Sequence, residues 1–212
     1  MNHINLWTSA DHALSYLAQA DKLPHRTEGE AVVLEHVPKT VKRILDLGTG
    51  DGRLLALLKI DRPQVGSIAI DFSPTMLEAA KQRFAGDEKM KIIDHNLDNP
   101  LPELGKFDAV VSSFAIHHLT HKRKHSLYAE IFNLLEPGGI FCNLEHVSSP
   151  TPALHEHFRV CIGIADKPED PSNKLLDVET QIKWLREIGY TDVDCYWKWL
   201  ELALLIGIKP NA

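Results

Sequence analysis

The sequence predicts an α/β protein in which helices cover both faces of a mostly parallel β-sheet. Beyond residue 40, short apolar runs that end in turn residues alternate with stretches whose apolar residues recur at helical spacing. This alternation is typical of units that place parallel strands side by side. The 212 residues are enough to bury a substantial core, and 44% hydrophobic and 25% charged residues are ordinary globular proportions.

Five apolar runs are typical of buried strands, and helical periodicity fills the intervals between them. The predicted strands are residues 43–47, 67–71, 90–93, 107–111 and 140–144. The predicted helices are two within the first forty residues, then residues 54–58, 73–84, 127–135 (closed by 137–139) and 178–188. Residues 193–208 predict two further strands. Their connection is not evident, because residues 196–201 hold no Gly, Pro, Asn or Asp.

Charge and cysteine usage restrict the class of protein. The formal net charge is −6, from 23 basic and 29 acidic residues, which argues against nucleic acid as the main partner. Three cysteines lie far apart without a CxxC pair, and the N-terminus lacks the plan of a signal peptide. No run approaches about 18 apolar residues. We therefore expect a cytoplasmic protein with free thiols and no membrane span, and the sequence leaves its oligomeric state open.

A glycine-rich loop follows the first predicted strand and reads DLGTGDG from Asp46 to Gly52. Glycines allow the chain to turn sharply and allow a ligand to lie against the backbone. The dinucleotide pattern G-x-G-x-x-G would require glycine at position 53, where this chain has Arg53, so a nicotinamide cofactor is disfavoured. A tight strand-to-helix turn without any ligand would explain the glycines as well.

Polar and aromatic residues follow the next two predicted strands. Asp71 ends the second strand, where a carboxylate can accept both hydroxyls of a ribose, and Phe72 can lie along an adenine. Asn96 can accept from an exocyclic amine, and Leu97 can offer its backbone to the edge of the ring. Because the carboxyl ends of parallel strands share one edge of a sheet, these loops should meet in one crevice. The alternative for Asp71 is a charge at a helix start, beside the cap Ser73.

Four stretches, taken in order, resemble the class I S-adenosylmethionine-dependent methyltransferases. They read ILDLGTGDG at residues 44–52, IDFSPTML at 70–77, FDAVVS at 107–112 and LLEPGG at 134–139, and the likeness covers roughly residues 40–147. The resemblance implies a Rossmann-like, seven-stranded sheet whose last strand is antiparallel. It also implies S-adenosyl-L-methionine as the cofactor and S-adenosyl-L-homocysteine as the product.

The resemblance assigns roles to individual residues. The glycine loop would hold the methionine part of the cofactor, Asp71 the ribose, and Phe72 and the residues after the third strand the adenine. Many relatives carry Asp at position 96, and Asn96 keeps the acceptor. Arg26 is the candidate to pair with the cofactor carboxylate; the alternative is a surface arginine paired with Glu28 or Glu30. The predicted cofactor-binding residues are Arg26, Asp46, Gly48, Thr49, Gly50, Asp71, Phe72, Met76, Asn96, Leu97 and Ser113.

The candidate catalytic residues are His117, His118, Glu145 and His146, which follow the fourth and fifth predicted strands. A histidine with a near-neutral pKa can act as a base for a hydroxyl or an amine. Packing at a helix start would explain the histidine pair as well. Of Glu145 and His146, one should face the substrate, because successive side chains alternate across a strand. We expect no metal, because His155 and His157 have no third ligand type nearby.

Together these features predict direct methyl transfer from S-adenosylmethionine to an oxygen, nitrogen or carbon of a small molecule. The sulfonium is already activated, so the protein mainly has to align and desolvate the reacting pair. One alternative is a non-catalytic sensor or partner subunit that binds the cofactor. Another is an RNA methyltransferase, for which residues 121–125 form the one basic cluster. That cluster is more simply the exposed face of a helix.

We expect a single domain over residues 1–212, with a helical cap at 1–40 and a lid at 148–177. Loops of such length in compact domains often cover a binding site. The acceptor pocket should then lie between residues 7–26, which include Trp7, and residues 148–177, above Ser113 and Glu145.

Overall fold

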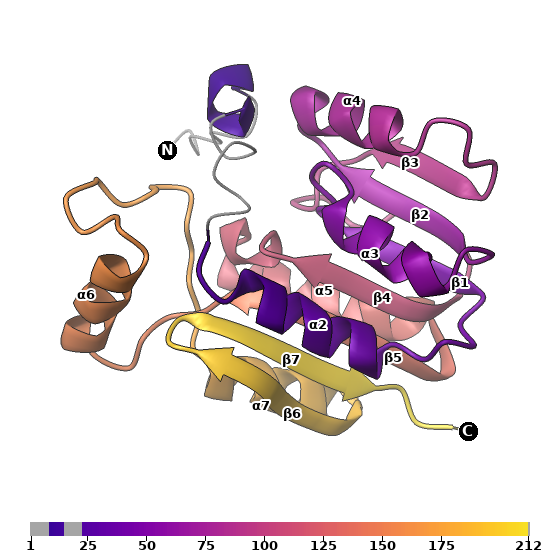
Figure 1. Ribbon diagram of the computed structural model, residues 1–212. Coiled ribbons are helices and arrows are strands. Elements are labelled where there is room, and N and C mark those ends of the chain that lie inside the picture. The colour runs from indigo at the N-terminus through magenta and orange to yellow at the C-terminus, as the bar shows by residue number, and fades with distance from the viewer. Residues whose placement is uncertain (1–8, 15–22, 212) are drawn as a thin grey trace.

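In the computed structural model, which describes residues 9–14 and 23–211, seven strands form one sheet (Figure 1). Across the sheet they are β3 (Met90–Asp94), β2 (Gly66–Asp71), β1 (Arg43–Leu47), β4 (Phe107–Ser113), β5 (Leu135–His146), β7 (Leu202–Ile208) and β6 (Thr191–Trp199). Strands β1 to β5 pair in parallel, whereas β7 is antiparallel to both of its neighbours. The predicted α/β class and the seven-stranded, mostly parallel sheet are confirmed.

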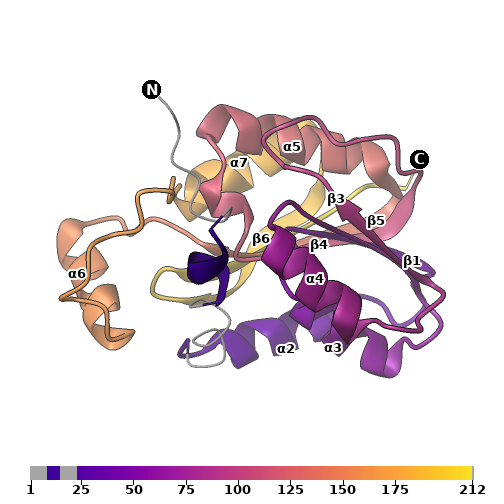
Figure 2. The same ribbon diagram turned by 90° about the horizontal axis from the view of Figure 1, so that it is seen from above.

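Helices cover both faces of this sheet. They are α2 (Arg26–His36), α3 (Arg53–Asp61), α4 (Pro74–Arg83), α5 (His121–Leu134), α6 (Pro152–Cys161) and α7 (Val178–Ile188), with a 3₁₀ turn, η2, at Ile116–His118. Figure 2 shows α2 and α3 on one face of the sheet, α5 and α7 on the other, and α6 standing off to one side. Two separate clusters of buried apolar residues fill the spaces between the sheet and these helices.

Neighbouring residues of one strand enter opposite layers of the core. Ile44 of β1 packs in the cluster beneath α2 and α3, whereas Leu45 packs in the cluster beneath α5 and α7. Ala109 and Val110 of β4 divide in the same way. Because side chains alternate across a strand and both faces are covered, both sets must be apolar. The strands therefore read in the sequence as continuous apolar runs.

The hairpin of β6 and β7 supplies the connection that the sequence left open. Its turn consists of Leu200 and Glu201, and Leu200 has a φ of 49°. Positive φ is uncommon outside glycine and is least expected for a bulky residue. The pairing of Trp199 with Leu202 closes the turn, so the strands impose it on a sequence without turn formers.

Strand β5 starts directly where α5 ends. The helix stops at Leu134, and Leu135 already pairs with Phe107 of β4. The register then shifts before Ala109 pairs with Ile140. Residues 137–139, which were expected to close the helix, are instead an irregular part of the strand, and that prediction is wrong.

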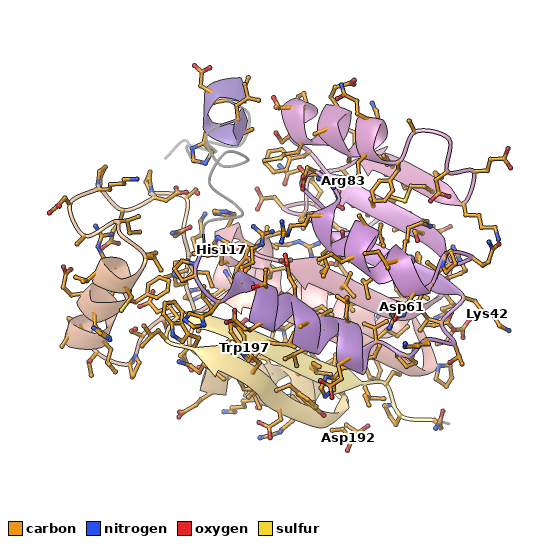
Figure 3. All side chains as sticks on the ribbon, viewed as in Figure 1. Lys42, Asp61, Arg83, His117, Asp192 and Trp197 are labelled. Carbon is orange, nitrogen blue, oxygen red and sulfur yellow. The ribbon has the colours of Figure 1, made fainter. Side chains whose placement is uncertain are left out.

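The predicted N-terminal cap is partly built into the core. Residues 10–14 are helical, and the carbonyl oxygen of Ser9 accepts the N–H of Ala13 at 3.1 Å. Helix α2 lies so close to the sheet that a Cβ on Gly29 would be 2.8 Å from Leu144 Cδ1 and 2.9 Å from the ring of Trp197, which is labelled in Figure 3. Trp7 and residues 15–22 lie outside the described residues.

Residues 148–177, the predicted lid, connect β5 to α7, lie outside the sheet and form hydrogen bonds among themselves. The N–H of Ser148 donates to the carbonyl oxygen of Leu176 at 3.2 Å, which holds the two ends of the segment together. Phe158 of α6 is buried in the core cluster beneath α2, and Nη2 of the buried Arg159 donates to the carbonyl oxygen of Ile164 at 3.0 Å. Whether the segment closes over a ligand stays a prediction.

Within residues 9–14 and 23–211, no helix is both long enough and apolar enough to cross a membrane.

Candidate functional site

A cleft opens at the carboxyl ends of β1, β2, β3 and β4. Its empty space, with open solvent at the mouth included, is about 890 Å³. All eleven predicted cofactor residues line it: Arg26, Asp46, Gly48, Thr49, Gly50, Asp71, Phe72, Met76, Asn96, Leu97 and Ser113. The structure thus brings the whole set to one place, while the ligand atoms that each would contact stay predictions. Lining residues that the sequence reasoning missed are Asp51, Arg53, Leu54, His95, Asp98, Phe114, Ala115 and Leu119.

Two glycines of the loop after β1 are required for different reasons. Gly48 has a φ of 66°, and a Cβ at this position would lie 2.2 Å from the Cβ of Ala115. Gly50 has a φ of 57°, but the nearest atom to a Cβ there is Sδ of Met76, at 4.0 Å. Gly48 therefore permits close packing against the loop after β4, whereas Gly50 supplies a left-handed conformation beside open space.

Asp71 connects the glycine loop to the start of α4. Its Oδ2 accepts the N–H of Gly50 at 2.8 Å, and its Oδ1 accepts those of Phe72 at 2.8 Å and Ser73 at 2.9 Å. Burial raises the pKa of Asp71, and these hydrogen bonds offset part of the increase. Ser73 does occupy the N-cap position, but its side chain makes no capping hydrogen bond. Asp71 therefore does accept hydrogen bonds at the start of α4, as the alternative predicted, and this role does not depend on a ligand.

Asp46 lies at the floor of the cleft and is almost fully buried. The hydroxyl of Thr49 donates to its Oδ2 at 2.6 Å. Burial nevertheless raises the pKa of Asp46 to about 7, and the neighbouring Asp71 and Asp51 act in the same direction. Near neutral pH this carboxyl group is therefore poised to become charged when a cation approaches.

Two arginines of the cleft share one buried carboxylate. Nε of Arg26 is 2.9 Å from Oε1 of Glu30, and Nε of Arg53 is 2.8 Å from the same oxygen. The guanidinium of Arg26 also lies 5.4 Å from the centroid of the Phe114 ring. Arg26 therefore pairs with Glu30, as the alternative of a surface arginine predicted, but its side chain is buried and not on the surface. In the sequence, Arg53 served only to exclude the dinucleotide pattern, which requires glycine at this position. Its place directly after the glycine loop was the signal that could have identified it as a residue of the cleft.

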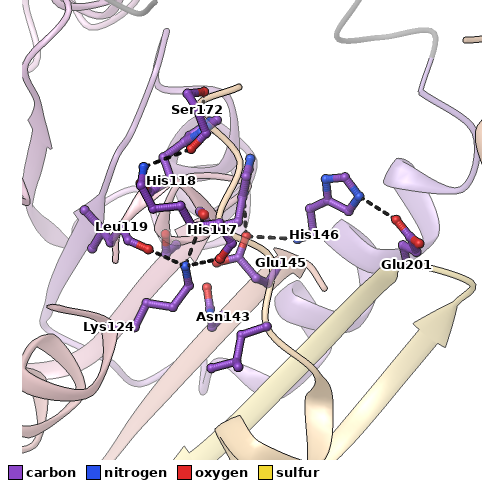
Figure 4. Close-up of polar contacts among 12 residues, drawn as sticks. His117, His118, Leu119, Lys124, Asn143, Glu145, His146, Ser172 and Glu201 are labelled. Atoms are coloured by element: carbon purple, nitrogen blue, oxygen red, sulfur yellow. Dashed lines mark hydrogen bonds and ion pairs between the residues drawn. The ribbon is translucent and has the colours of Figure 1, made fainter. Parts of the chain in front are cut away.

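The four candidate catalytic residues lie in different environments (Figure 4). His118 lines the cleft. His117 and Glu145 are buried together, with 2.7 Å between Nδ1 and Oε1, and Nε2 of His146 is 2.9 Å from Oε2 of Glu201. Burial raises the pKa of Glu145 and lowers that of His117 well below its usual value. None of His117, Glu145 and His146 is among the described residues that line the cleft.

The arrangement of sheet, glycine loop and cleft has counterparts among known proteins. The family model described as "Methyltransferase domain" matches residues 44–139, the stretch that runs from β1 into β5. These matches support a class I S-adenosylmethionine-dependent methyltransferase. Among solved structures, this methyltransferase is similar to an O-methyltransferase family protein from Burkholderia thailandensis, with a TM-score of 0.69 and 19% identity over 92% of this chain and 63% of that one. Human N-acetylserotonin methyltransferase in complex with SAM gives a TM-score of 0.70 and 17% identity over 97% and 58%.

Two curated relatives have named activities on small molecules. A demethylmenaquinone methyltransferase of Clavibacter sepedonicus is 28% identical over 172 residues, which are 74% of this chain and 69% of the relative. A carboxy-S-adenosyl-L-methionine synthase of Desulforapulum autotrophicum is 28% identical over 188 residues, which are 79% and 75%. The methyltransferase spans only 55% of a third relative, the demethylmenaquinone methyltransferase of Thermus thermophilus, which is 34% identical over 124 residues.

The methyltransferase buries a lysine where the sequence analysis expected an exposed basic helix face. Lys124 of α5 is fully buried, and its Nζ donates to the carbonyl oxygens of His117 at 3.1 Å, Leu119 at 2.6 Å and Lys174 at 2.7 Å. Burial lowers the pKa of Lys124 to about 8. For this residue the expectation is wrong, because three carbonyl groups of two distant segments converge on it, which helical spacing does not reveal.

Metal ligation has no geometric support within the described ranges. No three His, Cys, Asp or Glu side chains in residues 9–14 and 23–211 are arranged to hold an ion. Nδ1 of His155 is 2.8 Å from Oε1 of Glu201, and Nε2 is 3.2 Å from Oε1 of Glu169, so its ring connects α6 to the β6–β7 turn and to the loop after α6.

Proposed function

We propose that this methyltransferase transfers the methyl group of S-adenosyl-L-methionine directly to an oxygen, nitrogen or carbon of a small molecule. The observation that supports this best is the convergence of the eleven cofactor candidates, which come from well-separated parts of the sequence, on one cleft. Two curated relatives, a demethylmenaquinone methyltransferase and a carboxy-S-adenosyl-L-methionine synthase, have names that refer to small molecules.

The proposed ribose contact falls to Asp71. A carboxylate has about four lone-pair directions, and three of those on Asp71 already accept backbone N–H groups. The remaining direction lies on Oδ2, beside the loop of Gly50. We therefore assign one ribose hydroxyl to this oxygen, where the sequence alone suggested both. Phe72, Asn96 and Leu97 remain the proposed contacts of the adenine.

The proposed methionine end of the cofactor carries both charges of an amino acid and the sulfonium. Arg26 and Arg53 both line the cleft beside Glu30, and a guanidinium is a donor group that suits a carboxylate. Asp46 lies on the floor of the same cleft, and its raised pKa falls when a cation binds beside it. The methyl transfer itself then requires alignment of the acceptor with the sulfonium and exclusion of water.

The remaining expectations stay part of this proposal. We place the methyltransferase in the cytoplasm as a single domain, with residues 148–177 as the lid. All three cysteines are free, and Cys142 is buried within β5, as suits a reducing compartment. Nucleic acid and membranes are not proposed as partners.

Calorimetry separates the cofactor assignment from its competitor. We expect S-adenosylhomocysteine to bind and NAD not to bind. Asp71→Ala should weaken S-adenosylhomocysteine binding, whereas Asp194→Ala, at an exposed position of β6 outside the lining of the cleft, serves as the matched control. Binding of NAD without binding of S-adenosylhomocysteine would overturn the cofactor assignment.

Turnover then separates the enzyme from the alternatives. Formation of S-adenosylhomocysteine is measured with a metabolite mixture of small phenols, quinols, amines and acids, and separately with total RNA. Turnover with the small molecules supports the proposal, and turnover with RNA alone points to the RNA methyltransferase. Tight cofactor binding without turnover on either set points to a sensor or partner subunit.

A further inference from the structure

The loop after β3, which supplies residues 95–98 to the wall of the cleft, is held by an arginine of α5. Nε of Arg123 donates to the carbonyl oxygen of Leu97 at 2.6 Å, and Nη2 donates to that of Asn99 at 2.7 Å. Arg123 belongs to the basic cluster of residues 121–125, yet only 10% of its side chain is exposed. It is not among the described residues that line the cleft, so it holds the loop without facing the ligand.

Every donor of this guanidinium has an acceptor. Besides the two loop carbonyls, Nη1 donates to Oγ of Ser126 at 3.0 Å and to Oε1 of Glu130, and Nη2 donates to Oε2 of Glu130 at 2.9 Å. These contacts account for all five N–H groups of an arginine. Oε2 of Glu130 also accepts the N–H of Leu101 at 2.9 Å. Arg123 and Glu130 therefore hold three alternate residues of the loop against α5.

The loop's own hydrogen bonds set its shape but not its place in the molecule. Oδ1 of Asn96 accepts the N–H of Asp98 at 2.9 Å, and the carbonyl oxygen of Asn96 accepts the N–H of Asn99 at 3.0 Å. Such bonds within a turn move with it when the loop moves. The contacts with α5 join residues 24 to 29 positions apart, so they fix where the turn lies relative to the sheet.

We propose that Arg123 is a positioning residue of the cofactor site, which holds Asn96 where its side chain distinguishes adenine from other purines. The inference rests on the proposed function, in which Asn96 accepts from the exocyclic amine of the adenine. The N–H of Asp98 occupies one lone pair of Oδ1. An amide oxygen has two, so one remains for the amine. The direction of that lone pair follows the place of the turn, which Arg123 sets.

The expected effect of losing Arg123 depends on the ligand. Without the guanidinium, the loop occupies its binding-competent position for only a fraction of the time, and the apparent dissociation constant rises by the inverse of that fraction. A loop that is competent about one tenth of the time therefore weakens an adenine ligand about tenfold. A ligand that gains nothing from Asn96 binds both loop positions almost equally and loses little. The change in selectivity, not in affinity alone, identifies the positioning role.

Calorimetry with two ligands measures this selectivity. S-inosylhomocysteine differs from S-adenosylhomocysteine in that a carbonyl oxygen replaces the exocyclic amine, so the wild-type protein should bind it about tenfold more weakly or worse. Arg123→Met should weaken S-adenosylhomocysteine about tenfold and S-inosylhomocysteine by less than about threefold. Arg123→Lys keeps the charge beside Glu130 but lacks the planar fork, so its selectivity should lie between the two. Lys122→Met, at an exposed position of the same helix, is the control and should match the wild-type protein.

Hydrogen exchange reads the loop directly and begins with the wild-type protein, so it does not depend on a variant that folds. In the ligand-free chain, the amides of Asp98, Asn99 and Leu101 should be protected, because each donates to an acceptor. Arg123→Lys should lose this protection while β2 keeps its own, and S-adenosylhomocysteine should restore it. Unprotected loop amides in the wild-type protein would overturn the inference.

The binding data separate a positioning role from a merely structural one. If Arg123 only stabilised the fold, its variants would weaken both ligands by the same factor and leave their ratio at the wild-type value, which would overturn the inference. Equal affinity of the wild-type protein for the two ligands would overturn it as well, because the loop would then not distinguish the purines. Failure of the wild-type protein to bind S-adenosylhomocysteine would instead overturn the proposed function.

Discussion

A methyl group added to the glycine loop should have very different effects at two positions. Gly48 and Gly50 both have positive φ, at 66° and 57°, so alanine at either position has to adopt a left-handed conformation. This conformation costs about 1–2 kcal/mol for a residue with a Cβ. At Gly48 the new Cβ would also lie 2.2 Å from that of Ala115, whereas at Gly50 no atom is nearer than 4.0 Å.

The magnitudes follow from these two geometries. Gly50→Ala should lower the free energy of unfolding by the conformational term alone, about 1–2 kcal/mol. Gly48→Ala adds overpacking of about 1–3 kcal/mol, for a sum of about 2–5 kcal/mol. Adding Ala115→Gly to the Gly48→Ala variant removes the Cβ of residue 115, with which the new methyl group clashes. The double variant should therefore recover the overpacking part, which is a coupling between the two positions.

Urea unfolding of the ligand-free chain, followed by circular dichroism, gives the four free energies of the cycle. A Gly50→Ala variant as unstable as Gly48→Ala would show that conformation, not contact with Ala115, governs the loop. A double variant that is no more stable than Gly48→Ala would show that the loop does not pack against Ala115 in solution. Either result would refute the close approach on which the cleft geometry depends.

Three further outcomes are expected. Asp71→Ala should weaken S-adenosylhomocysteine binding by about 1.5–3 kcal/mol, measured by calorimetry, and should also lower the unfolding midpoint because three N–H groups lose their acceptor; unchanged affinity would leave Asp71 with its helix-start role alone. Because the pKa of Asp46 is raised to about 7 and a bound cation lowers it, S-adenosylhomocysteine affinity should fall about tenfold from pH 8 to pH 6 with proton release on binding. Asp46→Asn should abolish this slope, and a slope that persists in it would assign the proton elsewhere. In hydrogen exchange, residues 152–170 should gain protection with S-adenosylhomocysteine and an acceptor, whereas 172–177, bonded to η2 and α5, should be protected throughout; equal protection of 152–170 in every state would make the segment static scaffold.

Local patterns in the sequence were sufficient for the architecture. The apolar runs of β1 to β5 and the helical spacing between them predicted the layered sheet, because burial on both faces requires continuous apolar strands. The carboxyl edge then located the cleft before any single residue was assigned. The beginning of β5 was the exception, since its pairing with β4 continues through Pro137 and Gly138 despite their turn-forming character.

The sequence by itself determined β1 to β5, the helices between them and the edge at which the cleft opens, because each depends on the period or chain position of nearby residues, and the family resemblance supplied the set of residues gathered there. It did not predict α6, which lies within the segment expected to be a loop. Only the tertiary structure decided that Arg53 shares Glu30 with Arg26, that Lys124 is buried, and that Ser172 lies beside His118. These contacts join residues that are distant in the chain, and the partners of such side-chain contacts do not recur at a regular spacing in the sequence. Their partners become visible only when the sheet has placed the loops against one another.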